Sequence, residues 1–280
     1  MNTHLSIIND EISNDLEVCI DYLRREGINQ IDLRSINGVN LLDIDEVDLK
    51  QFADYLKRNN ISVGMIISPL FKWYSQNDST GNSFVTNFDL HGFNPQITTE
   101  SKIQYIQKAL NIAKMFNCDK IRIFSMIRGD TANLDFYLSE QIIYDYLLTQ
   151  SNENNISIYL ENEPMCNLSK IGEIKTIYGN SATYRNMKLL LDIGSIYFTR
   201  EKINQGELIS LINMATYIHL KDFSYSNNAY VTIGDGDIPY KSIFPSIIDI
   251  KRKNFVFETH TQQDLPSLSK SIQFVRSLLG

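Results

Sequence analysis

The feature that most constrains the fold of this chain is a repeated alternation of short apolar runs with longer amphipathic stretches. Eight runs rich in Ile, Val, Leu and Tyr are predicted to be strands, and their nearly continuous hydrophobicity is typical of parallel strands covered on both faces. The predicted strands are Leu5–Asn9, Gln30–Arg34, Ser62–Ser68, Lys120–Ser125, Ser157–Glu161, Lys188–Asp192, Tyr217–Leu220 and Phe255–Glu258.

The stretches between these runs carry apolar residues three or four positions apart, as in helices that pack one face against a sheet. One such stripe consists of Leu16, Cys19, Ile20 and Leu23. Eight strand-and-helix units within 280 residues suit a barrel of about 250 residues. The sequence therefore predicts an α/β fold, a single-domain (β/α)8 TIM barrel that occupies residues 1–280.

The charge and composition exclude several classes of partner. The formal net charge is -7 and the pI is about 5.2, so we expect neither nucleic acid nor an anionic membrane surface to be a partner. The beginning of the chain lacks a basic region followed by an apolar stretch, and the sequence has no long apolar run. These features predict a cytoplasmic protein without a membrane segment.

The longest irregular segment runs from Pro69 to Ile97 and is too long for a simple connection. It contains Trp73, Phe84, Phe88 and Phe93 among Asn, Ser and Gly residues. One interpretation is a lid or substrate loop. The other is a surface excursion whose aromatic side chains pack on the barrel, and the sequence does not choose between the two.

Polar residues end the last four predicted strands, at the face where barrels of this type carry their active sites. These residues are Glu161, Asp192, His219 and Glu258. A carboxylate at one strand end is more often a helix cap or a solvated loop residue. Four such ends in succession instead predict one shared divalent-metal site, because clustered carboxylates repel one another without a cation. Three carboxylates and one imidazole suit Mn, Mg or Co, with Zn or Fe also compatible.

Further polar residues near the strand ends are candidates for substrate binding. They are Arg34, Lys72, Glu163, Lys221, Asp222 and His260. The Lys221–Asp222 pair is equally well interpreted as a solvated pair that opens a loop. Arg122 lies inside a predicted strand, which favours a structural ion pair with a barrel carboxylate over a contact with substrate.

Several motifs, in their order along the chain, resemble the xylose isomerase-like TIM barrels. Within that superfamily the likeness is to the sugar phosphate isomerase/epimerase proteins, which include ketose 3-epimerases and inosose dehydratases. The motifs are IDLRSINGVNLLDID (31–45), ISPLFKW (67–73), KIRIFS (120–125), LENEP (160–164), LLDIGS (190–195), IHLKD (218–222), GDGDIP (234–239) and ETH (258–260).

The resemblance implies that Glu161, Asp192, His219 and Glu258 match the metal ligands of this group. Many relatives carry His or Asn where this chain has Ser195, so the resemblance does not carry over a contact at that position. The related DNA-repair endonucleases use additional histidines, and a chain with only 4 His does not fit that branch. The resemblance also leaves room for a homodimer formed through the outer helices.

Three hypotheses for function follow. In the first, a metal-dependent isomerase or epimerase removes a proton beside the carbonyl of a sugar or polyol through a metal-stabilised enediolate, with Glu161 and Glu258 as the acid–base pair. In the second, the same enolate chemistry expels a hydroxyl, and the protein is a dehydratase of a cyclic polyol ketone. In the third, the barrel binds sugar without catalysis, although an idle site has no need of three converging carboxylates.

Overall fold

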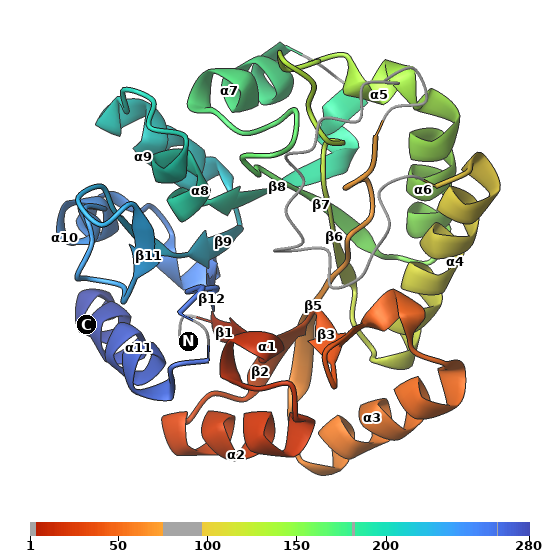
Figure 1. The fold of residues 1–280 in the computed structure, drawn as a ribbon, viewed down its shortest axis with the longest axis horizontal. Helices are drawn as coiled ribbons and strands as arrows, with labels where there is room; N and C mark the ends of the chain where they lie inside the picture. Colours follow the sequence, from red (N-terminus) through yellow and green to blue (C-terminus); the bar gives the residue numbers. More distant parts are fainter. Residues whose placement is uncertain (1–3, 75–96, 181–182, 262) are drawn as a thin grey trace.

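The computed structural model describes residues 4–74, 97–180, 183–261 and 263–280. Eight parallel strands close into a barrel in the order β1-β12-β9-β8-β7-β6-β5-β2 (Figure 1). Their bounds are β1 His4–Ile8, β2 Gln30–Leu33, β5 Ser62–Ile67, β6 Lys120–Ile123, β7 Ser157–Glu161, β8 Met187–Asp192, β9 Tyr217–Leu220 and β12 Asn254–Phe257. These strands coincide with the eight that the sequence predicts, with small differences at their ends, and the predicted (β/α)8 barrel is confirmed.

Helices surround the barrel on its outer side (Figure 1). The helices are α1 Asn9–Ile12, α2 Leu16–Glu26, α3 Glu46–Arg58, α4 Thr99–Met115, α5 Phe136–Ser139, α6 Gln141–Glu153, α7 Ile171–Asn180, α8 Ile193–Phe198, α9 Gln205–Met214, α10 Tyr240–Ile243 and α11 Leu265–Leu279. Two short hairpins, β3 Ser35–Ile36 with β4 Val39–Asn40 and β10 Asp222–Ser224 with β11 Ala229–Val231, lie in the loops that follow β2 and β9. Among the described residues, no helix combines the length and the apolar character that crossing a membrane requires.

The hydrophobic core has two parts. The larger part lies between the helices and the strands, and it includes the predicted stripe Leu16, Cys19, Ile20 and Leu23, all buried. The smaller part consists of Ile8, Met65, Ile67, Tyr159, Leu190, Tyr217 and Val256. Both faces of the strands are therefore covered, which explains why their sequences are apolar almost without interruption.

The strand register brings polar residues to one edge of the barrel. Asp192 on β8 is opposite His219 on β9, and His219 is opposite Val256 on β12, two residues before Glu258. Because all strands run parallel, their carboxyl ends open on the same face. Residues far apart in the chain thus meet at one end of the barrel.

The long segment predicted between Pro69 and Ile97 is described only in part. Trp73 is fully buried, its ring centroid lies 4.6 Å from that of Phe71, and the Lys102 ammonium lies 5.3 Å from the Trp73 centroid. This packing agrees with the interpretation that aromatic residues pack on the barrel. Phe84, Phe88 and Phe93 lie outside the described residues, so the lid hypothesis stays a prediction.

Candidate metal centre

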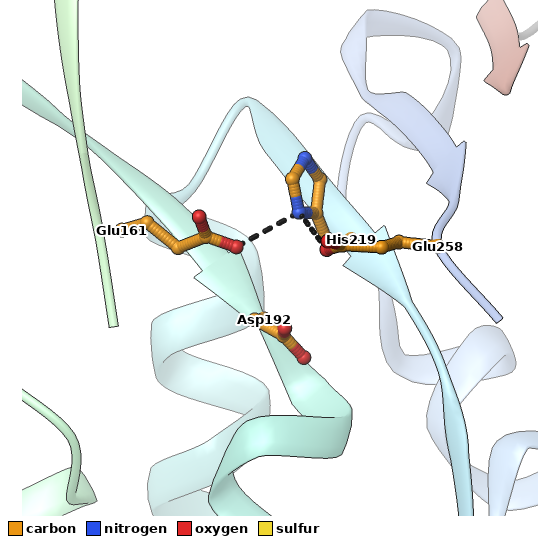
Figure 2. A group of neighbouring side chains, drawn as sticks. All are labelled: Glu161, Asp192, His219 and Glu258. Atoms are coloured by element: carbon orange, nitrogen blue, oxygen red, sulfur yellow. Dashed lines mark ion pairs between the residues drawn. The ribbon is translucent and has the colours of Figure 1, made fainter. Parts of the chain in front are cut away.

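Glu161, Asp192, His219 and Glu258 converge at the carboxyl ends of β7, β8, β9 and β12 (Figure 2). Each offers one potential ligand atom, and these atoms all lie within 4.8 Å of one another. All four side chains are buried. The structure therefore brings together the four residues that the sequence predicts to be metal ligands.

The His219 ring lies between the two glutamates. Its Nδ1 atom is 2.8 Å from Oε1 of Glu161 and 2.7 Å from Oε2 of Glu258. Donor atoms that share one cation at about 2.1 Å are separated by roughly 3 Å. Nδ1 meets these two oxygens without hydrogen-bond alignment, and Nε2 has no hydrogen-bond partner among the described residues. A buried imidazole placed between two carboxylates in this way fits a shared metal site.

Asp192 is oriented by the start of helix α8. Its Oδ1 accepts a hydrogen bond from the backbone N–H of Ser195 at 2.8 Å, as an N-cap residue does. The other oxygen, Oδ2, lies 2.6 Å from the Lys221 ammonium. Gly194 permits this approach, because a Cβ atom there would lie 2.4 Å from the Cβ of Lys221.

Each glutamate is held by an arginine through the oxygen that faces away from His219. Arg122 Nη1 is 2.6 Å from Oε2 of Glu161, and Arg34 Nη1 is 2.6 Å from Oε1 of Glu258. Asp10 fixes Arg34 in turn, with contacts of 2.9 Å to Nε and 2.7 Å to Nη2. One oxygen of each glutamate is thereby locked, and the other is directed toward the shared centre. Such outer contacts orient metal ligands in known sites.

The pKa values of the converging residues show that the centre stabilises positive charge. Burial alone would raise the pKa of Glu161, but the neighbouring His219 and Arg122 outweigh it and lower the pKa to about 2. Burial is likewise outweighed at Glu258, where Lys221 and His219 hold the pKa well below its usual value. Burial lowers the pKa of His219, but the two carboxylates more than compensate and raise it to about 10. Burial raises the pKa of Asp192. Glu161 and Glu258 are thus the ionised carboxylates of the centre, and they stabilise positive charge between them, on the His219 ring or on a bound cation.

The buried ion-pair network around the centre carries more acids than bases among the described residues. Six acids, Asp10, Glu11, Glu161, Glu163, Asp192 and Glu258, are linked to four bases, Arg34, Lys72, Arg122 and Lys221. A His219 ring that binds a metal is neutral and adds no charge to this count. Burial raises the pKa of Glu11 to about 7, so near neutral pH the excess is then one to two negative charges. One divalent cation balances that excess, which a buried network requires. The donor set and its charge therefore fit a divalent metal.

The predicted substrate-binding residues differ in burial and in their distance from the centre. Lys72 and Glu163 face each other at 3.4 Å, both buried, and the Lys72 ammonium also lies 4.7 Å from the centroid of the Phe124 ring. Lys221 lies inside the centre, 3.2 Å from Oε2 of Glu258. His260 is 22% exposed, and its Nε2 is 3.9 Å from Oε1 of Glu258. It is the most accessible residue of this set.

Two of the predicted contacts with substrate gain no support from the geometry. The Asp222 carboxylate accepts hydrogen bonds from the backbone N–H groups of Gly234, Gly236, Ile238 and Phe223, at 2.8, 3.1, 3.2 and 2.9 Å. It is fully buried, so it is not the solvated loop residue of the alternative interpretation either, and it holds the loop 234–238 in place. The Arg34 guanidinium is occupied by Asp10 and Glu258. Arg34 therefore orients Glu258, as Arg122 was expected to do for a barrel carboxylate.

Three residues of the site escape the sequence prediction. Asp10 and Glu11 lie in α1, directly after β1, and form ion pairs with Arg34. Glu11 also accepts hydrogen bonds from the Thr259 hydroxyl and the His260 N–H, both at 2.9 Å. The side chain of Asn162 bridges to the backbone of Asp192, with distances of 2.9 and 2.8 Å. The run Asn9-Asp10-Glu11 after an apolar strand is the same signal that identifies Glu161, so Asp10 and Glu11 were detectable.

Comparisons with solved structures support the fold. The D-allulose 3-epimerase from Methylomonas sp. is 15% identical with a TM-score of 0.70, covering 98% of this chain and 97% of its own. The probable 3-DHS dehydratase AsbF from Bacillus anthracis is 15% identical with a TM-score of 0.68, covering 97% and 98%. The IOLI protein with a binding zinc atom is 13% identical with a TM-score of 0.68, covering 98% and 96%. At these identities the likeness establishes the fold alone.

Comparisons of sequence give the family. No curated protein sequence matches the chain significantly. A family model described as "Xylose isomerase-like TIM barrel" matches residues 20–278, which is nearly the whole chain and contains all four converging residues. The closed eight-stranded barrel agrees with that match. The chain belongs to the xylose isomerase-like TIM barrel family.

Proposed function

We propose that this protein is a divalent-metal-dependent isomerase or epimerase of a polyhydroxylated carbonyl compound. One observation carries the proposal: Glu161 and Glu258 face each other across His219, and each has one oxygen held by an arginine and the other directed toward the shared centre. Two carboxylates on opposite sides of one centre suit the removal of a proton from carbon and its return. The similarity in fold to a D-allulose 3-epimerase is consistent with this chemistry.

Glu161, Asp192, His219 and Glu258 are the residues that would hold the metal. Carboxylates with one imidazole suit Mn, Mg or Co, and Zn is also compatible, as the zinc atom in the IOLI protein illustrates for a similar fold. When bound, the cation supplies Lewis-acid stabilisation of negative charge on oxygen.

The protein's own groups perform the proton transfers. One of Glu161 and Glu258 takes the proton from the carbon beside the carbonyl, and in an epimerisation the other delivers a proton to the opposite face. Arg122 and Arg34 keep the two carboxylates in position during both transfers. His260, Lys221 and Glu163 are the groups we assign to hydrogen bonds with substrate hydroxyls.

A dehydratase is the alternative reaction. The same proton abstraction beside a carbonyl begins the loss of a β-hydroxyl, and the probable 3-DHS dehydratase AsbF shares the fold. The two reactions start identically at Glu161 and Glu258, so their products must separate them. An epimerase exchanges a carbon-bound hydrogen with solvent and keeps every hydroxyl, whereas a dehydratase releases water and forms an enone.

The test incubates metal-loaded protein in D2O with a panel of ketoses and an inosose and follows products by NMR. Deuterium at a carbon beside the carbonyl, without loss of water, supports the epimerase. Formation of an enone would instead identify the protein as a dehydratase. Glu258→Gln and Glu161→Gln should each lower kcat by about 10²–10⁴-fold. The matched control is Glu153→Gln, since Glu153 is an exposed residue on α6. Full turnover by Glu258→Gln would remove the assigned acid–base role.

The third hypothesis, a sugar-binding barrel without catalysis, makes a separate prediction. Such a protein would bind a ketose without exchanging any carbon-bound hydrogen, and its affinity would not depend on metal. If no metal binds and no hydrogen exchanges, this hypothesis replaces the isomerase.

A further inference from the structure

The buried positive charges around the candidate metal centre are already engaged by carboxylates. Four Lys and Arg side chains are buried there, and each lies within ion-pair distance of an acid. The pairs are Arg34–Asp10, Lys72–Glu163, Arg122–Glu161 and Lys221–Asp192, with N–O distances of 2.7, 3.4, 2.6 and 2.6 Å. The positive charge of each of these four side chains is therefore already balanced.

Few further Lys or Arg residues lie near the strand ends. The segments outside the described residues, 1–3, 75–96, 181–182 and 262, contain neither residue type. In the described segments that lead from strand ends to the next helix, the remaining cations are Arg128 and Lys170, and Arg200 and Lys202 lie between α8 and α9. Arg128 lies 3.4 Å from Glu173, and the other three are exposed. Exposed cations are screened by salt and contribute little selectivity for an anion.

A charged substrate needs charge-matched donors in a buried site. A phosphate or carboxylate that leaves water loses several kcal/mol of solvation unless cationic donors replace it. Among the described residues, with His219 neutral as a metal ligand, the acids outnumber the bases six to four in the buried network, and one divalent cation only restores balance. An anionic substrate would bring back an uncompensated negative charge, whereas hydroxyl groups can share the paired side chains without changing the charge.

We propose that the substrate is an electrically neutral polyhydroxylated carbonyl compound, neither phosphorylated nor carboxylated. The inference rests on the proposed function, because it concerns the compound bound at that same metal centre. It narrows the substrate class: sugar phosphates and cyclic hydroxy-ketone acids are excluded, and free ketoses and uncharged cyclic polyol ketones remain.

The test compares a free ketohexose with its 6-phosphate, two compounds that share one carbon skeleton. Binding of each to Mn²⁺-loaded and to metal-free protein is measured by calorimetry, and the metal-dependent part of the affinity reports on the centre. The comparison with metal-free protein is needed because a cavity of about 1480 Å³ at the amino-terminal ends of the strands is lined by Arg24, Lys251 and Arg276. Any phosphate that bound there would bind without metal, and Arg276→Gln should weaken that binding.

The expected result is that the free ketose binds the metal-loaded protein at least roughly tenfold more tightly than the phosphate ester. In Glu163→Gln, where Lys72 loses an acidic partner, this preference should shrink by about tenfold. Equal or tighter metal-dependent binding of the ester, or no metal-dependent binding of either compound, would overturn the proposal. If the neutral compound is preferred but never epimerised, substrate neutrality stands and the proposed epimerase activity fails.

Discussion

The guanidinium of Arg122 lies over the ring of Phe124, with 4.2 Å between the guanidinium carbon and the ring centroid. From this position Nε of Arg122 donates to the backbone carbonyl of Ser68 at 3.0 Å, and Nη1 donates to Glu161 at 2.6 Å. Arg122 thus connects the end of β5 to a candidate metal ligand on β7. Its planar fork allows both hydrogen bonds at once, and a lysine lacks that geometry.

Arg122→Lys should therefore lower the affinity for a divalent cation by about 10–100-fold, the range found when outer contacts of metal ligands are removed. Calorimetric titration with Mn²⁺ measures the effect. Arg128→Lys is the matched control, because Arg128 pairs with Glu173 rather than with a candidate ligand. Unchanged affinity in Arg122→Lys would show that Glu161 does not depend on this contact.

Asp222 should be important for stability rather than for turnover. Asp222→Ala leaves the N–H groups of Gly234, Gly236 and Ile238 without their buried acceptor, which we expect to lower the free energy of unfolding by roughly 2–4 kcal/mol. Denaturant unfolding measures the loss. Asp235→Ala, in the same loop, removes only an exposed ion pair with Lys270 and should cost less than about 1 kcal/mol.

Position 236 in the motif of this loop accommodates only glycine. A Cβ atom at Gly236 would lie 2.2 Å from Oδ1 of Asp222, so no larger residue fits while the aspartate holds the loop. The motif GDGDIP was identified from sequence, but its partner was not. The contact joins two segments through the hydrogen bonds of one carboxylate, and nothing in the local pattern of either segment predicts it.

The fold was predictable because its signal is repeated eight times. Ser157–Glu161 was predicted with the bounds that the structure has, and Phe255–Glu258 was displaced by one residue from Asn254–Phe257. The hairpins β3–β4 and β10–β11 were missed. Their strands of two or three residues are too short to show a hydrophobic period.

The site was predictable to the extent that strand ends define it. Glu161, Asp192, His219 and Glu258 each end an apolar run, so their convergence follows from barrel geometry. The partners of Arg34 and Lys72 depend on side-chain directions after the strands end. The sequence predicts that these two bases contact substrate, but it does not predict their ion pairs with Asp10 and Glu163.

Asp32, a buried carboxylate outside the four converging residues, should make the stability of the protein depend on pH. Burial raises its pKa from 3.8 to about 6, although the hydroxyls of Ser6 and Tyr217 hydrogen-bond to it. Because the folded state holds this proton more tightly, the stabilisation is full below about pH 4 and is lost as the pH rises through 6. Relative to Asp32→Asn, the wild type should lose about 3 kcal/mol across that window. A constant difference between the two unfolding curves from pH 4 to 7 would argue against the shift.

The central claim is that Glu161, Asp192, His219 and Glu258 bind one divalent cation together. Its most direct test is the Mn²⁺ stoichiometry and affinity of the wild type, Asp192→Asn and Asp32→Asn, measured by calorimetry on metal-stripped protein. Asp32 is a buried carboxylate outside the group, so it controls for the general effect of losing a buried charge. The account predicts one site in the wild type and in Asp32→Asn, and a loss of at least roughly tenfold in affinity in Asp192→Asn. Equal affinity in Asp192→Asn and the wild type, or no binding in the wild type, would contradict it.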